Sequence, residues 1–250
     1  MKLQFKEQQF QLDAVSAIAD LFQGQAKQTG IRYMADPGRQ KSDEVDLILD
    51  AYRNAPIQLD RETIRGNVHA VQNRFELRPS ESLSVDMVTG RPAYNFSIEM
   101  ETGTGKTYTY IRTIMELNKR YGWLKFVIVV PSVAIREGVL KSLEIMKTHF
   151  QEEYEKQPRY FVYDSSNSSN IANINTFASD DSIQVMIINY QPFNAKGTAN
   201  RRIYEELDEL QSRRPIDVIK SVHPILIVDE PQKFGTRQKS YLMNLNHYLK

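Results

Sequence analysis

The segment METGTGKT at positions 100–107 constrains the fold of this chain more than any other. It follows 95–100, which we predict to be a strand, and it precedes 107–121, whose apolar spacing predicts a helix. A glycine-rich turn that joins a strand to a helix and ends in Gly-Lys-Thr is the context of a phosphate-binding loop. The sequence therefore predicts an α/β domain with three layers, of the P-loop NTPase type.

Each residue type in this loop has a role in binding nucleotide phosphates. The glycines let backbone N–H groups turn inward around a phosphate at the amino end of a helix. Lys106 can reach the β- and γ-phosphates of ATP, and Thr107 can ligate Mg²⁺. Position 100 is Met where the strict motif has Gly. The alternative is a glycine-rich turn without a ligand. The predicted nucleotide site comprises Thr102, Gly103, Thr104, Gly105, Lys106 and Thr107.

A second motif, ILIVDEPQ at 225–232, places two carboxylates at the end of an apolar strand. The carboxyl ends of parallel strands are where α/β domains bind ligands. Asp229 can hold Mg²⁺ through water, and Glu230 can orient or deprotonate an attacking water. Together with Lys106 they form the predicted catalytic set. The alternative is an acidic turn after a core strand.

Three weaker candidates each have a plain structural alternative. Gln11 lies on a predicted helix at 8–22, and its amide can recognise the donor and acceptor edge of adenine, unless it is a surface glutamine. Ser132 and Arg136 can hold a nucleic-acid phosphate, or Ser132 is only a helix cap. Phe193 can stack on a base, or it belongs to an ordinary loop.

The rest of the sequence predicts a largely parallel sheet covered by helices. Several of its expected strands are continuous apolar runs, which is typical of strands that are buried on both faces. We read 24–95 as an inserted subdomain and the polar stretch 164–182 as a mobile surface loop. The expected strands are 82–88, 126–130, 160–163, 185–188 and 225–229, and the expected helices are 45–52, 63–75, 133–150, 201–211 and the tail from 238.

Composition excludes several classes of protein. The net charge is +1, so any contact with nucleic acid must come from a local patch. The chain has no cysteine, which excludes disulfides and cysteine-ligated metals. It contains no run of eighteen apolar residues, so we expect no membrane span and a cytoplasmic protein.

Taken together, METGTGKT, VVPSVAIREGV, IINYQPFN and IVDEPQ resemble the restriction subunit of type III restriction-modification enzymes, which are superfamily-two helicase-like proteins. The resemblance runs from Gln11 to Gln232 and is weaker over 24–95. It implies a RecA-like fold, ATP hydrolysis with Mg²⁺, movement along double-stranded DNA and a methyltransferase subunit as partner. It also implies that Gln232 couples hydrolysis to nucleic-acid contact, and the P-loop of this family carries Met at position 100.

The same resemblance implies parts that this sequence does not supply: a second RecA-like domain with an arginine finger, and a nuclease domain. We therefore expect residues 1–250 to be the first RecA-like domain, able to bind nucleotide but slow to hydrolyse it alone. A phosphate-release assay with and without duplex DNA measures this. Two alternatives stay open: a generic DNA or RNA helicase, and a nucleotide-binding interaction module without turnover. An adjacent methyltransferase gene would favour restriction.

Overall fold

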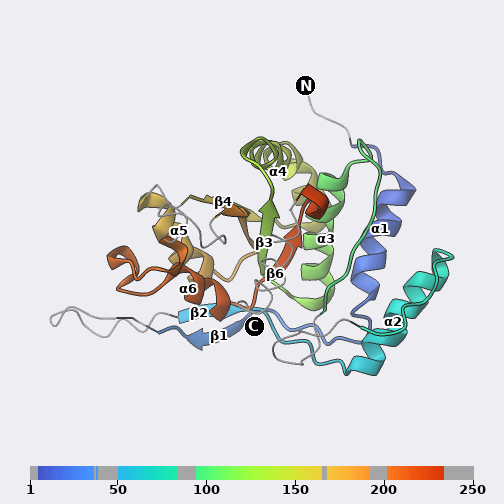
Figure 1. Ribbon diagram of the computed structural model, residues 1–250, viewed down its shortest axis with the longest axis horizontal. Coiled ribbons are helices and arrows are strands. Elements are labelled where there is room, and N and C mark those ends of the chain that lie inside the picture. The colour runs from blue at the N-terminus through green and yellow to red at the C-terminus, as the bar shows by residue number, and fades with distance from the viewer. Residues whose placement is uncertain are drawn as a thin grey trace. The chain divides into compact units, whose positions relative to one another are not determined.

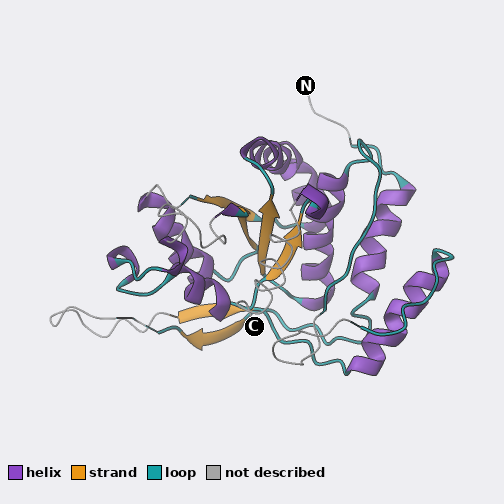
Figure 2. Cartoon of the chain, viewed as in Figure 1, coloured by secondary structure: helices purple, strands orange, loops and turns teal. Residues whose placement is uncertain are grey.

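The computed structural model describes residues 5–36, 38, 50–83, 94–164, 168–191 and 202–233 (Figures 1 and 2). Its chain divides into two compact units, each described by itself below. The helical unit comprises 1–27, 56–121 and 142–157, and the sheet unit comprises 28–55, 122–141 and 158–250. The predicted insertion, 24–95, contributes to both units, and its status as a subdomain stays a prediction.

The sheet unit is built on four parallel strands, as the apolar runs predict. In spatial order they are β4 (Arg159–Tyr163), β5 (Gln184–Asn189), β3 (Lys125–Val130) and β6 (Ile225–Val228). Every residue of β3 is buried, as is nearly all of β5. The expectation for β6 was wrong in one respect: its four residues are only half-buried. It is the last of the described strands in the sheet, so only one of its sides pairs with a described strand.

Residues 164–182, expected to be a mobile loop, include the helix α5 (Ser168–Ser179). From 173 to 179, where its side chains are described, the buried ones are Ile174, Phe177 and Ala178, spaced three and four residues apart as on one face of a helix. They join the core formed with β3, β5 and the short helix α6 (Pro215–Ser221). The many serines and asparagines suggested a loop, although the apolar residues of this stretch already had helical spacing.

The single helix expected at 201–211 is also wrong. The chain forms two 3-10 turns there, η3 (Arg202–Tyr204) and η4 (Asp208–Leu210). The N–H of Leu207 donates to the carbonyl of Arg213, which closes a loop and removes that donor from any helical ladder. Ile203, Leu207 and Leu210 are nevertheless buried, so the apolar spacing predicted burial but not the backbone.

An antiparallel hairpin completes the sheet unit. It pairs β1 (Ile31–Met34) with β2 (Asp50–Arg53), where a helix over 45–52 was expected. Arg32 on β1 forms an ion pair with Asp50, and Ala51 is buried in the core. A short stretch can fit both the helical and the strand spacing of apolar residues, and here the pairing with β1 makes it a strand. Residues 39–49, most of the strand expected at 82–88, and the helix expected from 238 lie outside the described residues.

The helical unit contains α1 (Gln9–Asp20), α2 (Arg61–Arg74), α3 (Lys106–Tyr121) and the part of α4 (Val133–Tyr154) that begins at Ser142. These helices confirm the sequence predictions to within a few residues, and α1 packs along α3. The strand expected at 95–100 is not formed: the structure assigns no strand to this stretch. Its alternating pattern suits a strand, but alternation does not supply a hydrogen-bonded partner. None of the described helices is long and apolar enough to cross a membrane.

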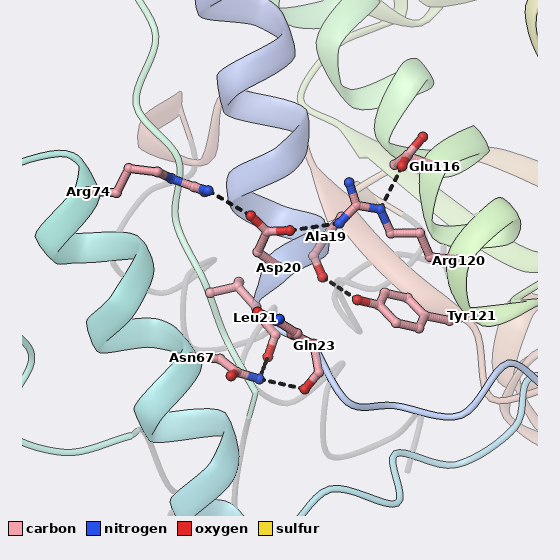
Figure 3. A network of polar contacts seen from close by, with 9 residues as sticks. All are labelled: Ala19, Asp20, Leu21, Gln23, Asn67, Arg74, Glu116, Arg120 and Tyr121. Atoms are coloured by element: carbon pink, nitrogen blue, oxygen red, sulfur yellow. Dashed lines mark hydrogen bonds and ion pairs between the residues drawn. The ribbon is translucent and has the colours of Figure 1, made fainter.

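Polar contacts fix the carboxyl end of α1 (Figure 3). The carboxylate of Asp20 accepts from Arg74 of α2 at 2.8 Å and from Arg120 of α3 at 2.7 Å. The amide of Asn67 donates to the carbonyls of Leu21 and Gln23 at 3.1 and 3.0 Å, while Tyr121 donates to that of Ala19 at 2.7 Å. Side chains from α2 and α3 thus bond to backbone carbonyls in the last turn of α1 and just beyond it.

Asp20 should make stability depend on pH. Burial raises its pKa, but hydrogen bonds from Arg74 and Arg120 outweigh burial and bring the pKa below the usual 3.8. Its stabilisation is therefore present above pH 4 or so and is lost as the pH falls through the lower, folded-state pKa. We expect Asp20→Asn to lower the free energy of unfolding by about 1 kcal/mol at pH 7.

Urea unfolding of Asp20→Asn and the parent from pH 7 to pH 3 measures this difference. The gap between them should narrow in the acid range. Glu205→Gln, at an exposed position, is the control and should follow the parent throughout. A gap that is absent at pH 7, or that does not narrow on acidification, contradicts the assignment.

Asn54 holds together the amino ends of two strands in the sheet unit. Its side-chain oxygen accepts from the N–H groups of Leu124 and Lys125 at 2.7 and 2.9 Å. Its side-chain nitrogen donates to the carbonyls of Lys125 and His223 at 2.8 and 3.0 Å. Asn54 is 2% exposed; its contacts with Leu124 and Lys125 are buried, and its contact with His223 is partly buried. One residue outside the parallel sheet therefore fixes where β3 and β6 begin.

We expect Asn54→Ala to lower the free energy of unfolding by about 2–4 kcal/mol, because buried backbone groups would lose their partners. Denaturant unfolding of the variant measures it. Asn73→Ala, at an exposed position on α2, is the matched control and should be nearly neutral. If both variants lower the free energy of unfolding by the same small amount, Asn54 does not anchor the sheet.

Candidate nucleotide-binding site

In the helical unit, the phosphate-loop motif forms a tight turn that ends where α3 begins, at Lys106. Gly103 and Gly105 have φ angles of 81° and 86°, in the left-handed region that glycine adopts without strain. The hydroxyl of Thr104 donates to the carbonyl of Glu101 at 2.6 Å and closes the turn. A Cβ added at Gly103 would meet nothing within 4 Å, so this side of the loop is open to a ligand.

The side chain of Lys106 folds back over the loop. Its ammonium group donates to the carbonyl of Met100 at 3.1 Å and to that of Glu101 at 3.4 Å. The ammonium thus lies beside the loop backbone at the amino end of α3, where unpaired N–H groups and the helix dipole also favour an anion. Lys106 lies where the motif predicts.

Gln11 contacts the same loop from α1. Its side-chain nitrogen donates to the carbonyl of Thr104 at 2.8 Å, across 93 positions of sequence. A Cβ added at Gly105 would lie 2.4 Å from this nitrogen, so the close approach depends on glycine. The sequence identified both Gln11 and the loop as candidates but did not anticipate a direct bond between them. This bond uses one amide N–H, and the other N–H and the oxygen of Gln11 make no hydrogen bond among the described contacts.

A buried arginine holds the segment before α1 against α3. The guanidinium of Arg112 donates to Glu7 at 3.0 Å, to the hydroxyl of Tyr108 at 2.6 Å, and to Glu153 of α4. The side chain of Arg112 is only 8% exposed, so these charge-assisted bonds are largely shielded from water. Together with the Asp20 contacts at its far end, they fix α1 at both ends and hold Gln11 at the loop. Sequence reasoning missed Arg112, since a lone arginine within a helix carries no signal of burial.

These groups suit a nucleoside triphosphate with Mg²⁺. The loop offers backbone N–H groups, an ammonium and the hydroxyl of Thr107 at one helix end, which are the donors and the Mg²⁺ ligand that phosphates require. Thr102 lies at an exposed position on the same turn. The amide of Gln11 adds a group able to recognise adenine.

In the sheet unit, the two predicted carboxylates follow β6. The N–H of Asp229 donates to the carbonyl of Val129 at 3.0 Å and continues the pairing of β6 with β3. Glu230 has φ 52°, an unusual conformation for a residue other than glycine, and the 3-10 turn η5 (Pro231–Lys233) follows. Because β3, β5 and β6 are parallel, the segments after all three lie at one edge of the sheet.

Ser132 caps α4, which is one of the two interpretations that the sequence allowed. Its hydroxyl accepts from the N–H of Ile135 at 3.3 Å, and its carbonyl accepts from that of Arg136 at 3.0 Å. The guanidinium of Arg136 bonds to the neighbouring Glu137 at 3.0 Å. Nucleic-acid contact by either residue stays a proposal, and Phe193 lies outside the described residues.

Two further polar groups at this edge were not singled out from the sequence. The side-chain oxygens of Asn189 and Gln191 are buried and have no hydrogen-bond partner among the described residues. Both belong to the IINYQPFN motif, whose polar residues follow an apolar strand. That change from apolar to polar was the only signal in the sequence.

Comparison with known proteins agrees with these motifs. The family model described as "Type III restriction enzyme, res subunit" matches residues 57–248. The chain is 35% identical over 158 residues to the type III restriction-modification enzyme EcoP15I Res subunit of Escherichia coli, and 33% identical over 158 residues to the EcoPI Res subunit of Escherichia phage P1. It is 34% identical over 164 residues to the StyLTI Res subunit of Salmonella typhimurium. These matches cover 58–59% of this chain and 16% of each relative.

Proposed function

The chain belongs to the res-subunit family of type III restriction enzymes, and from this premise we propose that it is the ATP-binding motor domain of a DNA translocase that serves restriction. The observation that carries the proposal is the bond between the Gln11 amide and the Thr104 carbonyl. It supports the proposal because it joins an amide of the kind that can recognise adenine to a loop whose sequence is typical of phosphate binding.

In the proposed reaction Lys106 neutralises charge on the β- and γ-phosphates, and the hydroxyl of Thr107 ligates Mg²⁺. Asp229 holds the same ion through water, and Glu230 orients or deprotonates the attacking water. Transfer of a phosphoryl group depends mainly on positioning and on stabilising charge. The roles of Asp229 and Glu230 rest on their motif and on their place after β6.

Family membership also supports the proposed partners. We propose double-stranded DNA as the track and a methyltransferase subunit as the partner. A second RecA-like domain would supply an arginine finger, and a nuclease domain would cut the DNA. Ser132, Arg136 and Phe193 are proposed to contact DNA, and Gln232 to couple that contact to hydrolysis. The chain spans about 16% of the length of the relatives it matches, so these whole-enzyme properties are proposals here.

We expect Lys106→Ala to weaken Mg-ATP binding by roughly tenfold to a hundredfold, since it removes a charge-assisted contact to phosphate. Calorimetric titration of the variant and the parent measures the affinity. Lys147→Ala, at an exposed position on α4, is the control and should bind as the parent does. Unchanged affinity in a folded Lys106→Ala variant contradicts the site.

We expect the chain to prefer ATP to GTP, and Gln11→Ala to reduce that preference by roughly five- to a hundredfold, because a bidentate amide–adenine pair contributes about 1–3 kcal/mol. Competition binding of the two nucleotides gives the ratio. Gln9→Ala is the matched control on the same helix, because Gln9 bonds to Asp13 and not to the loop. Equal affinity for the two nucleotides in the parent would remove the adenine role of Gln11.

A further inference from the structure

Two neighbouring side chains hold one oxygen of the Glu230 carboxylate. The ammonium of Lys233 lies 3.0 Å from Oε2 of Glu230, and the amide nitrogen of Gln232 donates to the same oxygen at 3.2 Å. The second oxygen, Oε1, receives no bond among the described contacts. The carboxylate is therefore fixed through one oxygen, while the other remains available as an acceptor.

The backbone around Glu230 builds this arrangement. The N–H of Lys233 donates to the carbonyl of Glu230 at 3.0 Å, which closes the turn η5 and brings Lys233 back to Glu230. Glu230 itself has φ 52°, outside the regions that L-residues ordinarily adopt. A left-handed residue and a 3-10 turn at the end of β6 are thus combined with two donors aimed at one carboxylate oxygen.

The contacts add little to folding, which makes a role in the reaction testable. The side chain of Lys233 is 55% exposed and that of Glu230 is 20% exposed. Exposed ion pairs contribute little to stability because solvent screens them and ordering two side chains costs entropy. They can still restrict a carboxylate to one orientation, and a reacting group that is held in place reacts faster.

We propose that Lys233, together with Gln232, is a positioning residue that holds the Glu230 carboxylate by Oε2 and so presents Oε1 to the attacking water. The inference rests on the proposed function, in which Glu230 orients that water. It assigns a role to Lys233, which the motif analysis did not single out, and it gives Gln232 a contact within this unit.

The test is single-turnover hydrolysis of labelled Mg-ATP by an excess of the chain, with nucleotide affinity measured in parallel. Lys233→Met keeps the length of the side chain but removes its charge, and we expect it to lower the hydrolysis rate by roughly two- to fivefold at unchanged affinity. Lys233→Arg retains a cationic donor and should keep most of the rate. Gln232→Ala should lower the rate as well, and the double variant should be slower than either single one.

Arg65→Met is the matched control, because Arg65 forms an exposed ion pair with Glu62 at the same three-residue spacing on α2. It should leave the rate unchanged. A Lys233→Met rate equal to or above that of the parent, or a Lys233→Arg variant as slow as Lys233→Met, overturns the inference. If circular dichroism shows that Lys233→Met does not fold, the rate of Gln232→Ala decides instead, and an unchanged rate overturns it.

Glu230→Gln separates the inference from the proposed function beneath it. A slow Glu230→Gln variant beside an unimpaired Lys233→Met variant refutes the role of Lys233 alone. A Glu230→Gln variant that hydrolyses ATP at the parent rate refutes the role proposed for Glu230, whatever Lys233 does.

Discussion

The parallel pairing of β3 with both of its neighbours is the constraint on which the sheet unit depends. Because β3 pairs in the same direction with β5 and with β6, the three strands must all end at one edge. Hydrogen bonds carry the pairing past the strand ends: Tyr190 donates to the carbonyl of Val130, and Asp229 donates to that of Val129. Three motifs that are far apart in the sequence are therefore neighbours in space. The direction of the strands alone therefore brings the polar residues of these motifs to one edge, whichever side chains they carry.

The two candidate catalytic segments depend on left-handed backbone, but in different ways. At Gly103 and Gly105 the residue type itself indicates a positive φ, so the sequence alone predicts the loop. At Glu230 the same region of φ is occupied by a residue that ordinarily avoids it, and no pattern of residue types reveals this. The loop was therefore predictable in detail, whereas the turn after β6 required the structure.

The sequence predicted the elements that a strong period or a motif defines. α1, α3, α4 and the four parallel strands all appeared where the apolar residues placed them. Two of the failures share a cause, which is that local composition does not specify a hydrogen-bonded partner strand. The stretch 95–100 alternates like a strand but has no strand assigned to it, and β2 became a strand because β1 pairs with it. In α5 the polar composition concealed the spacing of Ile174 and Phe177, although that signal could have been read.

Contacts between distant residues explain what was missed at the candidate site. Gln11 was chosen for the chemistry of its amide, but its bond to Thr104 depends on how α1 packs on α3, which a single sequence does not show. Arg112 and Asp20 secure the two ends of that packing, yet each looks like an ordinary charged residue on a helix surface. The nucleotide loop can thus be predicted from local sequence, while the group proposed to read the base is positioned by long-range contacts.

The amino edge of the parallel sheet is held by hydrogen bonds from two buried side chains, those of Asn54 and Lys125. Asn54 makes four hydrogen bonds there, and the ammonium of Lys125 donates to the carbonyls of Phe177, at 2.6 Å, and Asp180 at the end of α5. Burial lowers the pKa of Lys125 to about 8, although Asp180 and Asp181 oppose the shift.

These contacts at the amino edge join strands to the surrounding loops and hold the fold together. At the carboxyl edge the side-chain oxygens of Asn189 and Gln191 are buried without a partner among the described residues. Unpaired buried acceptors cost stability, so a fold retains them where another requirement outweighs that cost. Asp229 and Glu230 also lie at the carboxyl edge, and the carboxyl ends of parallel strands are where α/β domains bind ligands.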